Sequence, residues 1–280
     1  MSFVLSAVFG LLGFAFTAHA VPLEGMFEQG GFLWGHATPG STVKLDKTAL
    51  EVDAKGRFFA GLDRSTPAAV TLHVVAPDGQ TTEQVIPVQQ RKFPTQQITG
   101  VANKYVNPDP QLLKRIHKES AAIAAAKKPF WSGINYTRGF SLPVSAPKSG
   151  VYGSRRLFNG EERSWHKGLD LAAPAGTPVH APAAGIVRLA LPNSFFNGNL
   201  VVLDHGHHVF TIYAHLHEMA VKPGQHVAAG DVLGTVGATG RATGPHLHWG
   251  VYWRNMALDP ALFVAAGTHI TSLAEGATTQ

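Results

Sequence analysis

The sequence contains no cysteine in its 280 residues. This absence excludes disulfide bonds, thiolate metal sites and cysteine nucleophiles, so a bound metal would rest on histidine and carboxylate side chains. Histidine is correspondingly common: the chain has 15, and most of them lie at or after His166. The uneven distribution indicates a metal site in the C-terminal half.

Charged residues are also scarce, at 15% of the chain, whereas 30 glycines and 18 prolines are present. This composition favours turn-rich β structure over helical bundles. The net charge of +5 favours an anionic partner, such as a cell wall, a membrane surface or a nucleic acid. No dense run of lysine and arginine is present, which argues against nucleic acid. The length favours two domains.

The N-terminal segment has no lysine or arginine, and the first cationic side chain is Lys44. Residues 3–16 are almost uninterruptedly apolar, and the small residues Ala18 and Ala20 follow at the spacing of a signal-peptide cleavage site. We therefore predict an exported protein with a signal peptide at residues 1–20. A retained anchor is the alternative, although the apolar run is shorter than the roughly 20 residues of a membrane span.

Residues 21–95 consist of short β-prone runs separated by turn residues, a pattern typical of a small sandwich or barrel. Pro77, Asp78 and Gly79 form a strong turn between two such runs and predict a hairpin. Strands are expected at residues 31–34, 42–45, 57–60, 69–75 and 83–88. We predict an immunoglobulin-like module. It contains no cluster of potential ligands, so we expect it to be a spacer, a steric cover or a substrate-positioning domain.

A linker with a helix is expected at residues 96–139. Asp109 is a typical N-cap, Pro110 a typical first helical residue, and Pro129 stops the helix. Its apolar residues recur on one face: Leu112, Ile116 and Ile123. Residues 140–266 form a second β-rich unit, with strands expected at 185–189, 199–203, 209–213, 231–236 and 246–252, and residues 267–280 form a tail.

Three short stretches of the second unit carry potential ligands within otherwise apolar sequence. His166 and Asp170 belong to the first, His215 to the second, and His246 and His248 to the third. Alternation along a strand places His246 and His248 on one face, where two imidazoles can meet one ion. Two histidines and one aspartate suit Zn²⁺, and three protein ligands with an open fourth position are typical of catalytic sites. A His-x-His pair alone is more often incidental, so the interpretation depends on the joint occurrence.

These stretches resemble a known family, the lysostaphin-like (M23 or LytM-type) zinc endopeptidases of bacterial cell-wall metabolism. The resemblance covers residues 150–263. It rests on His-Lys-Gly-Leu-Asp at 166–170, Tyr-Ala-His-Leu at 213–216 and Gly-Pro-His-Leu-His at 244–248, and on Tyr-Gly-Ser-Arg at 152–155. One departure is Gly250, where the family commonly carries an acidic residue.

The resemblance implies a C-terminal metallopeptidase domain with one zinc ion per chain. His166, Asp170 and His248 are expected to bind the zinc, and His215 and His246 to serve the reaction without binding it. The metal would polarise the scissile carbonyl and activate a water molecule. One of the two remaining histidines would accept the proton, and the other would stabilise the oxyanion or protonate the leaving amine.

The implied substrate is an amide bond in peptidoglycan peptides, and the implied location is the periplasm. A D-alanyl-diaminopimelate cross-link is the preferred substrate, and a glycyl-glycine bridge is the alternative within the same enzyme class. A wall-associated or regulatory protein is a further candidate partner. The rival hypothesis is a zinc-containing protein that binds peptidoglycan or activates an amidase without cleaving anything.

The remaining histidines of the second unit are expected to have structural or surface roles. His205, His207 and His208 follow Asp204 in a segment that resembles a strand end of the family, which favours packing and turn formation over a second metal or substrate contact. Surface or packing positions are expected for His180, His217 and His226. The glycine-containing loop at 237–244 lacks the ending of a P-loop and is expected to form a groove wall.

Overall fold

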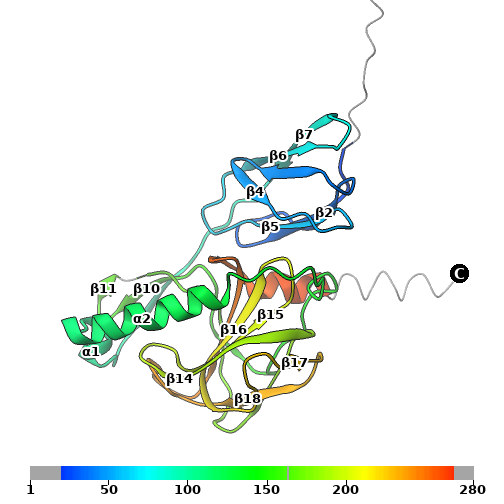
Figure 1. The fold of residues 1–280 in the computed structure, drawn as a ribbon. Helices are drawn as coiled ribbons and strands as arrows, with labels where there is room; N and C mark the ends of the chain where they lie inside the picture. The colour runs from blue at the N-terminus through cyan, green and yellow to red at the C-terminus, as the bar shows by residue number, and fades with distance from the viewer. Residues whose placement is uncertain (1–19, 163, 268–280) are drawn as a thin grey trace, which may run out of the picture.

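The computed structural model describes residues 20–162 and 164–267. The predicted signal peptide, except Ala20, and nearly all of the predicted tail lie outside the described residues. Within them the protein is mainly β, as predicted, and its strands form two units joined by a linker (Figure 1). No helix in the described part of the chain is long and apolar enough to cross a membrane.

The N-terminal unit consists of two small antiparallel sheets. One has the order β1-β2-β5, with β1 at Leu23–Met26, β2 at Phe32–His36 and β5 at Arg57–Gly61. The other has the order β4-β3-β6-β7, with β3 at Thr42–Leu45, β4 at Thr48–Leu50, β6 at Ala69–Val75 and β7 at Thr81–Pro87. Strand β6 buries Val70, Leu72 and Val74 at alternate positions. This alternation gives β6 one apolar face, and the predicted β6–β7 hairpin is confirmed.

The linker contains a strand as well as helix, which the sequence did not predict. Strand β8 (Thr95–Ile98) pairs in parallel with β10 (Arg155–Phe158), which also pairs with β11 (Glu161–Glu162). Helix α1 (Asn103–Val106) follows, and then α2 (Pro110–Ala126). The carboxylate of Asp109 accepts hydrogen bonds from the first-turn amides of α2, so the predicted N-cap is confirmed.

Helix α2 lies across the outer face of the large C-terminal sheet (Figure 1). Its predicted apolar face is half-buried, and Ile123 packs on a cluster that includes Leu200, Val202 and Phe210. The carboxylate of Glu119 accepts hydrogen bonds from the Ser194 hydroxyl and the Phe195 amide. The helix therefore packs as part of the C-terminal unit and does not act only as a linker.

The C-terminal unit is built on a ten-stranded sheet whose main path is β17-β14-β15-β16-β19-β12-β9. Strand β13 pairs with β18, which pairs with β16, and β20 pairs with β19. The strands not yet located are β9 (Lys148–Gly150), β12 (Leu169–Leu171), β13 (Pro178–His180), β14 (Gly185–Ser194), β15 (Gly198–Asp204), β16 (Val209–Met219), β17 (His226–Val227), β18 (Val232–Val236), β19 (Leu247–Trp253) and β20 (Met256–Leu258). Strands β15 and β16 are buried on both faces, which is why they read as nearly continuous apolar runs.

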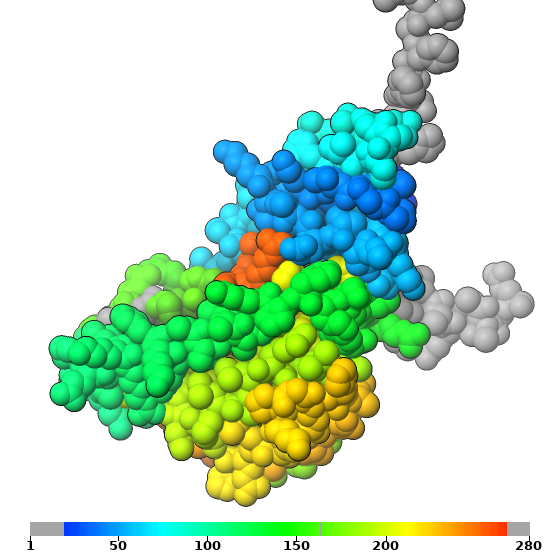
Figure 2. Space-filling model, viewed as in Figure 1, coloured from blue at the N-terminus to red at the C-terminus, as the bar shows by residue number. Residues whose placement is uncertain are grey.

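One hydrophobic core runs through both units. The ring of Phe32 in β2 stacks on Phe263 with centroids 4.1 Å apart, and Phe59 in β5 packs edge-on against Tyr136 at 4.8 Å. Figure 2 shows the blue N-terminal unit seated directly on the C-terminal half, with an orange segment from near the chain end in the contact. Because both units contribute rings to the same core, the N-terminal unit is fixed to the rest of the molecule.

Candidate metal centre and active-site groove

Strand pairing brings two of the predicted ligands together. Strands β12 and β19 are antiparallel neighbours, and their register places Asp170 directly opposite His248. His166 precedes β12 and is held by a backbone hydrogen bond from its amide to the Ser154 carbonyl at 2.8 Å. Opposed residues in such a pair have side chains on the same face, so the three groups meet above the sheet.

The three ligand atoms form a nearly equilateral triangle. Nδ1 of His248 lies 2.8 Å from Oδ1 of Asp170, and Nε2 of His166 lies 3.0 Å from each of these two atoms. In a tetrahedral zinc site with bonds of about 2.0–2.1 Å, ligand atoms are about 3.3 Å apart. The residues present therefore fit zinc after an outward shift of a few tenths of an ångström.

The protonation states of these ligand groups also suit the binding of a cation. Nδ1 of His166 donates to the Val151 carbonyl at 3.0 Å, which leaves Nε2 without a proton. Burial lowers the pKa of His166 to about 4, so the ring is neutral at neutral pH. Burial acts to raise the pKa of Asp170, but its close contacts with the rings of His166 and His248 outweigh burial and hold that pKa well below its usual range. One carboxylate and unprotonated ring nitrogens are the ligand forms that metal binding requires.

The other two predicted histidines lie beside this triangle without belonging to it. The rings of His215 and His246 have centroids 4.8 Å apart, and the His215 ring is 6.2 Å from that of His248. Nδ1 of His215 donates to the Thr239 carbonyl at 2.8 Å, and Nδ1 of His246 donates to the Gly244 carbonyl at 2.9 Å. In both rings Nε2 is left to accept a proton.

His215 adopts a left-handed backbone conformation that is unusual for a residue with a side chain. Its φ is +63°, and its amide leaves the strand ladder to donate to the Asn197 carbonyl at 2.8 Å. Such strain costs about 1–3 kcal/mol and persists where the surrounding structure enforces it. Burial, together with the neighbouring His246 and His248, lowers the pKa of His215 to about 3, so the ring is neutral.

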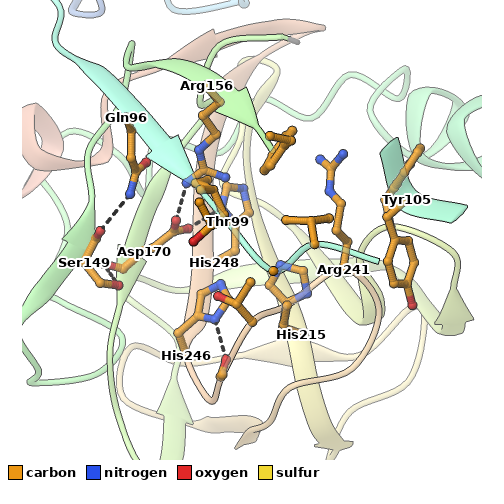
Figure 3. Close-up of a pocket in the computed structure, with 18 of the residues that line it drawn as sticks. Gln96, Thr99, Tyr105, Ser149, Arg156, Asp170, His215, Arg241, His246 and His248 are labelled. Atoms are coloured by element: carbon orange, nitrogen blue, oxygen red, sulfur yellow. Dashed lines mark hydrogen bonds and ion pairs between the residues drawn. The ribbon is translucent and has the colours of Figure 1, made fainter. Parts of the chain in front are cut away.

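Asp170, His215, His246 and His248 line a groove of about 630 Å³ with walls from two parts of the chain (Figure 3), and the buried His166 lies behind them. One wall is the loop at residues 241–245, which includes part of the segment that the sequence predicted as a groove wall. The other wall comes from residues 96–102 and Tyr105 of the linker, which sequence reasoning did not assign to the site. Asn159 clamps this linker wall, because its side chain accepts from the Val101 amide at 3.3 Å and donates to the Val101 carbonyl at 2.8 Å.

Steric contacts explain why glycine stands at two positions near the site. A Cβ at Gly168 would lie 2.8 Å from Cε1 of His248, so only glycine lets that ring reach its position. A Cβ at Gly250 would lie 2.7 Å from a ring carbon of Tyr252. The residue that departs from the family pattern therefore stands where a larger side chain would have to displace the Tyr252 ring.

The remaining histidines take structural or surface positions. Within residues 20–162 and 164–267, His166, Asp170 and His248 are the only group of three potential metal ligands whose atoms converge. His205 is fully buried, with Nδ1 donating to the Ala184 carbonyl and Nε2 accepting from the Thr211 hydroxyl, both at 2.8 Å. His207 and His208 are also buried, whereas the other three are exposed, as expected: His180, His217 and His226.

Comparison with known proteins agrees with this geometry. The profile of Peptidase family M23 matches residues 164–260. The chain is 46% identical over 84 residues to the peptidoglycan DD-endopeptidase ShyC of Vibrio cholerae, covering 30% of this chain and 19% of that protein. It is 42% identical over 95 residues to the DD-carboxypeptidase/endopeptidase Mpg of Neisseria meningitidis, covering 34% and 22%. The chain thus spans only about a fifth of these curated relatives.

A solved structure extends the similarity over nearly the whole chain. A peptidase M23 structure from Pseudomonas aeruginosa is 34% identical, with a TM-score of 0.66, and the match covers 86% of this chain and 96% of that one. At 86% of the chain, the match extends well beyond the residues around the metal centre. The chain therefore belongs to peptidase family M23.

Proposed function

We propose that this protein is an exported zinc endopeptidase that hydrolyses peptide cross-links of bacterial peptidoglycan. The observation that carries the proposal is the triangle of His166, Asp170 and His248 at the base of an open groove, with two further histidines beside it. The relatives support the substrate class, because ShyC is named a peptidoglycan DD-endopeptidase and Mpg a DD-carboxypeptidase/endopeptidase. The apolar N-terminal segment supports export to the periplasm.

The division of labour follows from the ring geometry. Zinc, when bound to His166, Asp170 and His248, supplies a Lewis acid that polarises a carbonyl and lowers the pKa of a water molecule. His215 and His246 each present an unprotonated Nε2, because Nδ1 donates to a backbone carbonyl. One of these rings accepts the proton of the attacking water, and a ring that has gained it is the donor for the leaving amine.

The preferred bond is a D-alanyl-diaminopimelate cross-link, and the glycyl-glycine bridge is the alternative. The DD-endopeptidase names of the relatives favour the first. The net charge of +5 suits an anionic polymer. The groove is open and has walls on two sides, which suits an extended peptide attached to a polymer better than a small enclosed substrate.

The test uses residues 21–280 loaded with zinc and two defined substrates, a D-alanyl-diaminopimelate dimer and a glycyl-glycine bridged peptide, followed by mass spectrometry. The parent should release monomers from the first. His215→Ala should lower the rate by about 10²–10⁴-fold, because proton transfer is lost, while zinc content stays at one per chain. His248→Ala should lose zinc and activity together.

Each outcome separates the hypotheses. Cleavage of the glycyl-glycine peptide alone would move the protein to the alternative substrate. A zinc-loaded parent that cleaves neither peptide would contradict the enzyme assignment and favour the non-cleaving binding or amidase-activating protein. In that case, amidase activation that survives His215→Ala would establish the regulatory role.

A further inference from the structure

A guanidinium group contacts the metal centre from outside the predicted ligand set. Nη2 of Arg156 donates to Oδ2 of Asp170, and the two side chains are only 15% and 9% exposed (Figure 3). The other carboxylate oxygen, Oδ1, faces the ring nitrogens of His166 and His248. The two oxygens of Asp170 are therefore divided between the arginine and the metal-binding triangle.

The surrounding backbone leaves space for this ion pair. Gly150 in β9 is the register partner of Asp170, and a Cβ there would collide with Oδ2 and lie 3.0 Å from Nη2 of Arg156. Glycine at this position lets the guanidinium reach the carboxylate. Arg156 itself lies on β10, whose parallel pairing with β8 sets Arg156 opposite Gln96 of the linker.

The pair is also desolvated. Nε of Arg156 is buried and has no hydrogen-bond partner in the structure, so the Asp170 carboxylate is the hydrogen-bonded anion that compensates this charge. Truncating one partner of a buried charge pair leaves the other uncompensated, which is strongly unfavourable. Charge-assisted contacts of this kind also fix orientation, because a guanidinium donates in a rigid plane.

We propose that Arg156 is a positioning residue of the metal centre, which holds Asp170 so that a single oxygen is offered to the metal. A free carboxylate can bind a cation with one oxygen or with both, and occupying Oδ2 removes the second mode. Partners of metal ligands typically change metal affinity by about 10–100-fold when they are removed. The inference rests on the zinc site of the proposed function, and it extends the influence of the linker, through β8 and β10, to that site.

The test measures zinc affinity without substrate, by competition with a chromogenic chelator on residues 21–280. Arg156→Met should weaken zinc binding by about 10–100-fold. Arg156→Lys, which keeps the charge but not the planar fork, should recover part of the loss. Arg155→Met is the matched control, because the neighbouring Arg155 pairs with Glu162 at 2.6 Å on the exposed surface, and its affinity should stay within twofold of the parent.

Replacing zinc with cobalt gives a second measurement, the visible absorption bands, which a general loss of protein stability would not change. The visible bands of cobalt are strong with four ligands and weaken when more atoms bind, so Arg156→Met should weaken them while Arg155→Met leaves them unchanged. A parent-like zinc affinity for Arg156→Met would overturn the proposal. If that variant does not fold, Arg156→Gln replaces it, and a parent-like affinity there has the same meaning. A parent that binds no zinc would overturn the proposed function as well.

Discussion

Three of the four histidines of the site are oriented by backbone carbonyls. His166, His215 and His246 each donate from Nδ1 to a carbonyl oxygen, which leaves Nε2 of each ring without a proton. Since a carbonyl can only accept, this contact selects the tautomer as well as the ring angle. The same residue types on a flexible surface would sample both tautomers and many orientations, so the carbonyls are part of what makes the cluster chemically competent.

A buried histidine outside the site should make stability depend on pH. Burial lowers the pKa of His205 to about 4, whereas an unfolded chain protonates it near 6.5. Above pH 6.5 the ring is neutral in both the folded and the unfolded state, so it does not make the free energy of unfolding depend on pH. As pH falls from 6.5 to about 4, the unfolded state gains the proton first, so stability is lost in this window.

We expect the free energy of unfolding of the zinc-free parent to fall more steeply than that of His205→Gln between pH 7 and 4.5. The difference should be on the order of 2 kcal/mol, by the linkage between proton binding and folding. Urea denaturation at each pH measures it. His166 contributes to the acid response of both proteins and cancels in the comparison. Parallel pH curves would show that His205 binds its proton as readily in the folded state as in the unfolded state.

At the scale of elements, the linker strand β8 has the largest unexpected consequence. It forms one wall of the groove and also pairs with the strand that carries Arg156. Gln96 connects it to β9 through a hydrogen bond from its side chain to the Ser149 carbonyl at 3.2 Å (Figure 3). In the described part of the chain, none of the residues that line the groove belongs to the N-terminal unit. The linker, rather than the N-terminal unit, is therefore the part of the N-terminal half that would meet a substrate bound in the groove.

Loosening the linker wall should affect substrate binding more than chemistry. Asn159→Gly removes both hydrogen bonds to Val101 and keeps the positive φ of +51° accessible. We expect KM for the cross-linked peptide to rise several-fold with kcat nearly unchanged, and stability to fall by about 1 kcal/mol. Steady-state kinetics on the zinc-loaded protein measures both constants. A rise in kcat/KM would instead show that the wall obstructs the groove.

At the scale of the whole molecule, the shared core makes the two units one cooperative structure. Besides the stacked rings of Phe32 and Phe263, an ion pair at 2.8 Å joins Arg91 to Asp259 across the contact, and the Asp259 amide donates to the Gly30 carbonyl at 2.7 Å. Separating the units would expose these rings to water. Free hinge motion between the N-terminal and C-terminal units is therefore incompatible with this packing.

We predict a single calorimetric unfolding transition for residues 21–280. Phe32→Ala should destabilise the whole molecule by about 3–5 kcal/mol, because it leaves a cavity between the units. Val85→Ala is a control in the same module, since Val85 is 64% exposed, and it should change stability by no more than about 0.5 kcal/mol. Two separate transitions, with only the first shifted by Phe32→Ala, would contradict a common core.

The sequence by itself determined the features that depend on short spacing. The N-cap at Asp109, the two-residue spacing of His246 and His248, and the His166 to Asp170 motif all concern residues a few positions apart. Local geometry decides which way such side chains point, so pattern was sufficient to predict many of the strands, the helix start and the five candidate site residues. The resemblance to a known family then divided these five into ligands and non-ligands.

Only the tertiary structure decided which distant segments meet these residues. The contact of Arg156 with Asp170 depends on how β9, β10 and β12 lie together, and the groove wall depends on the pairing of β8 with a strand far along the chain. The docking of Phe32 on Phe263 depends on packing between complete units. No local pattern encodes such contacts, because register and packing are settled jointly by all the strands that share a sheet or a core.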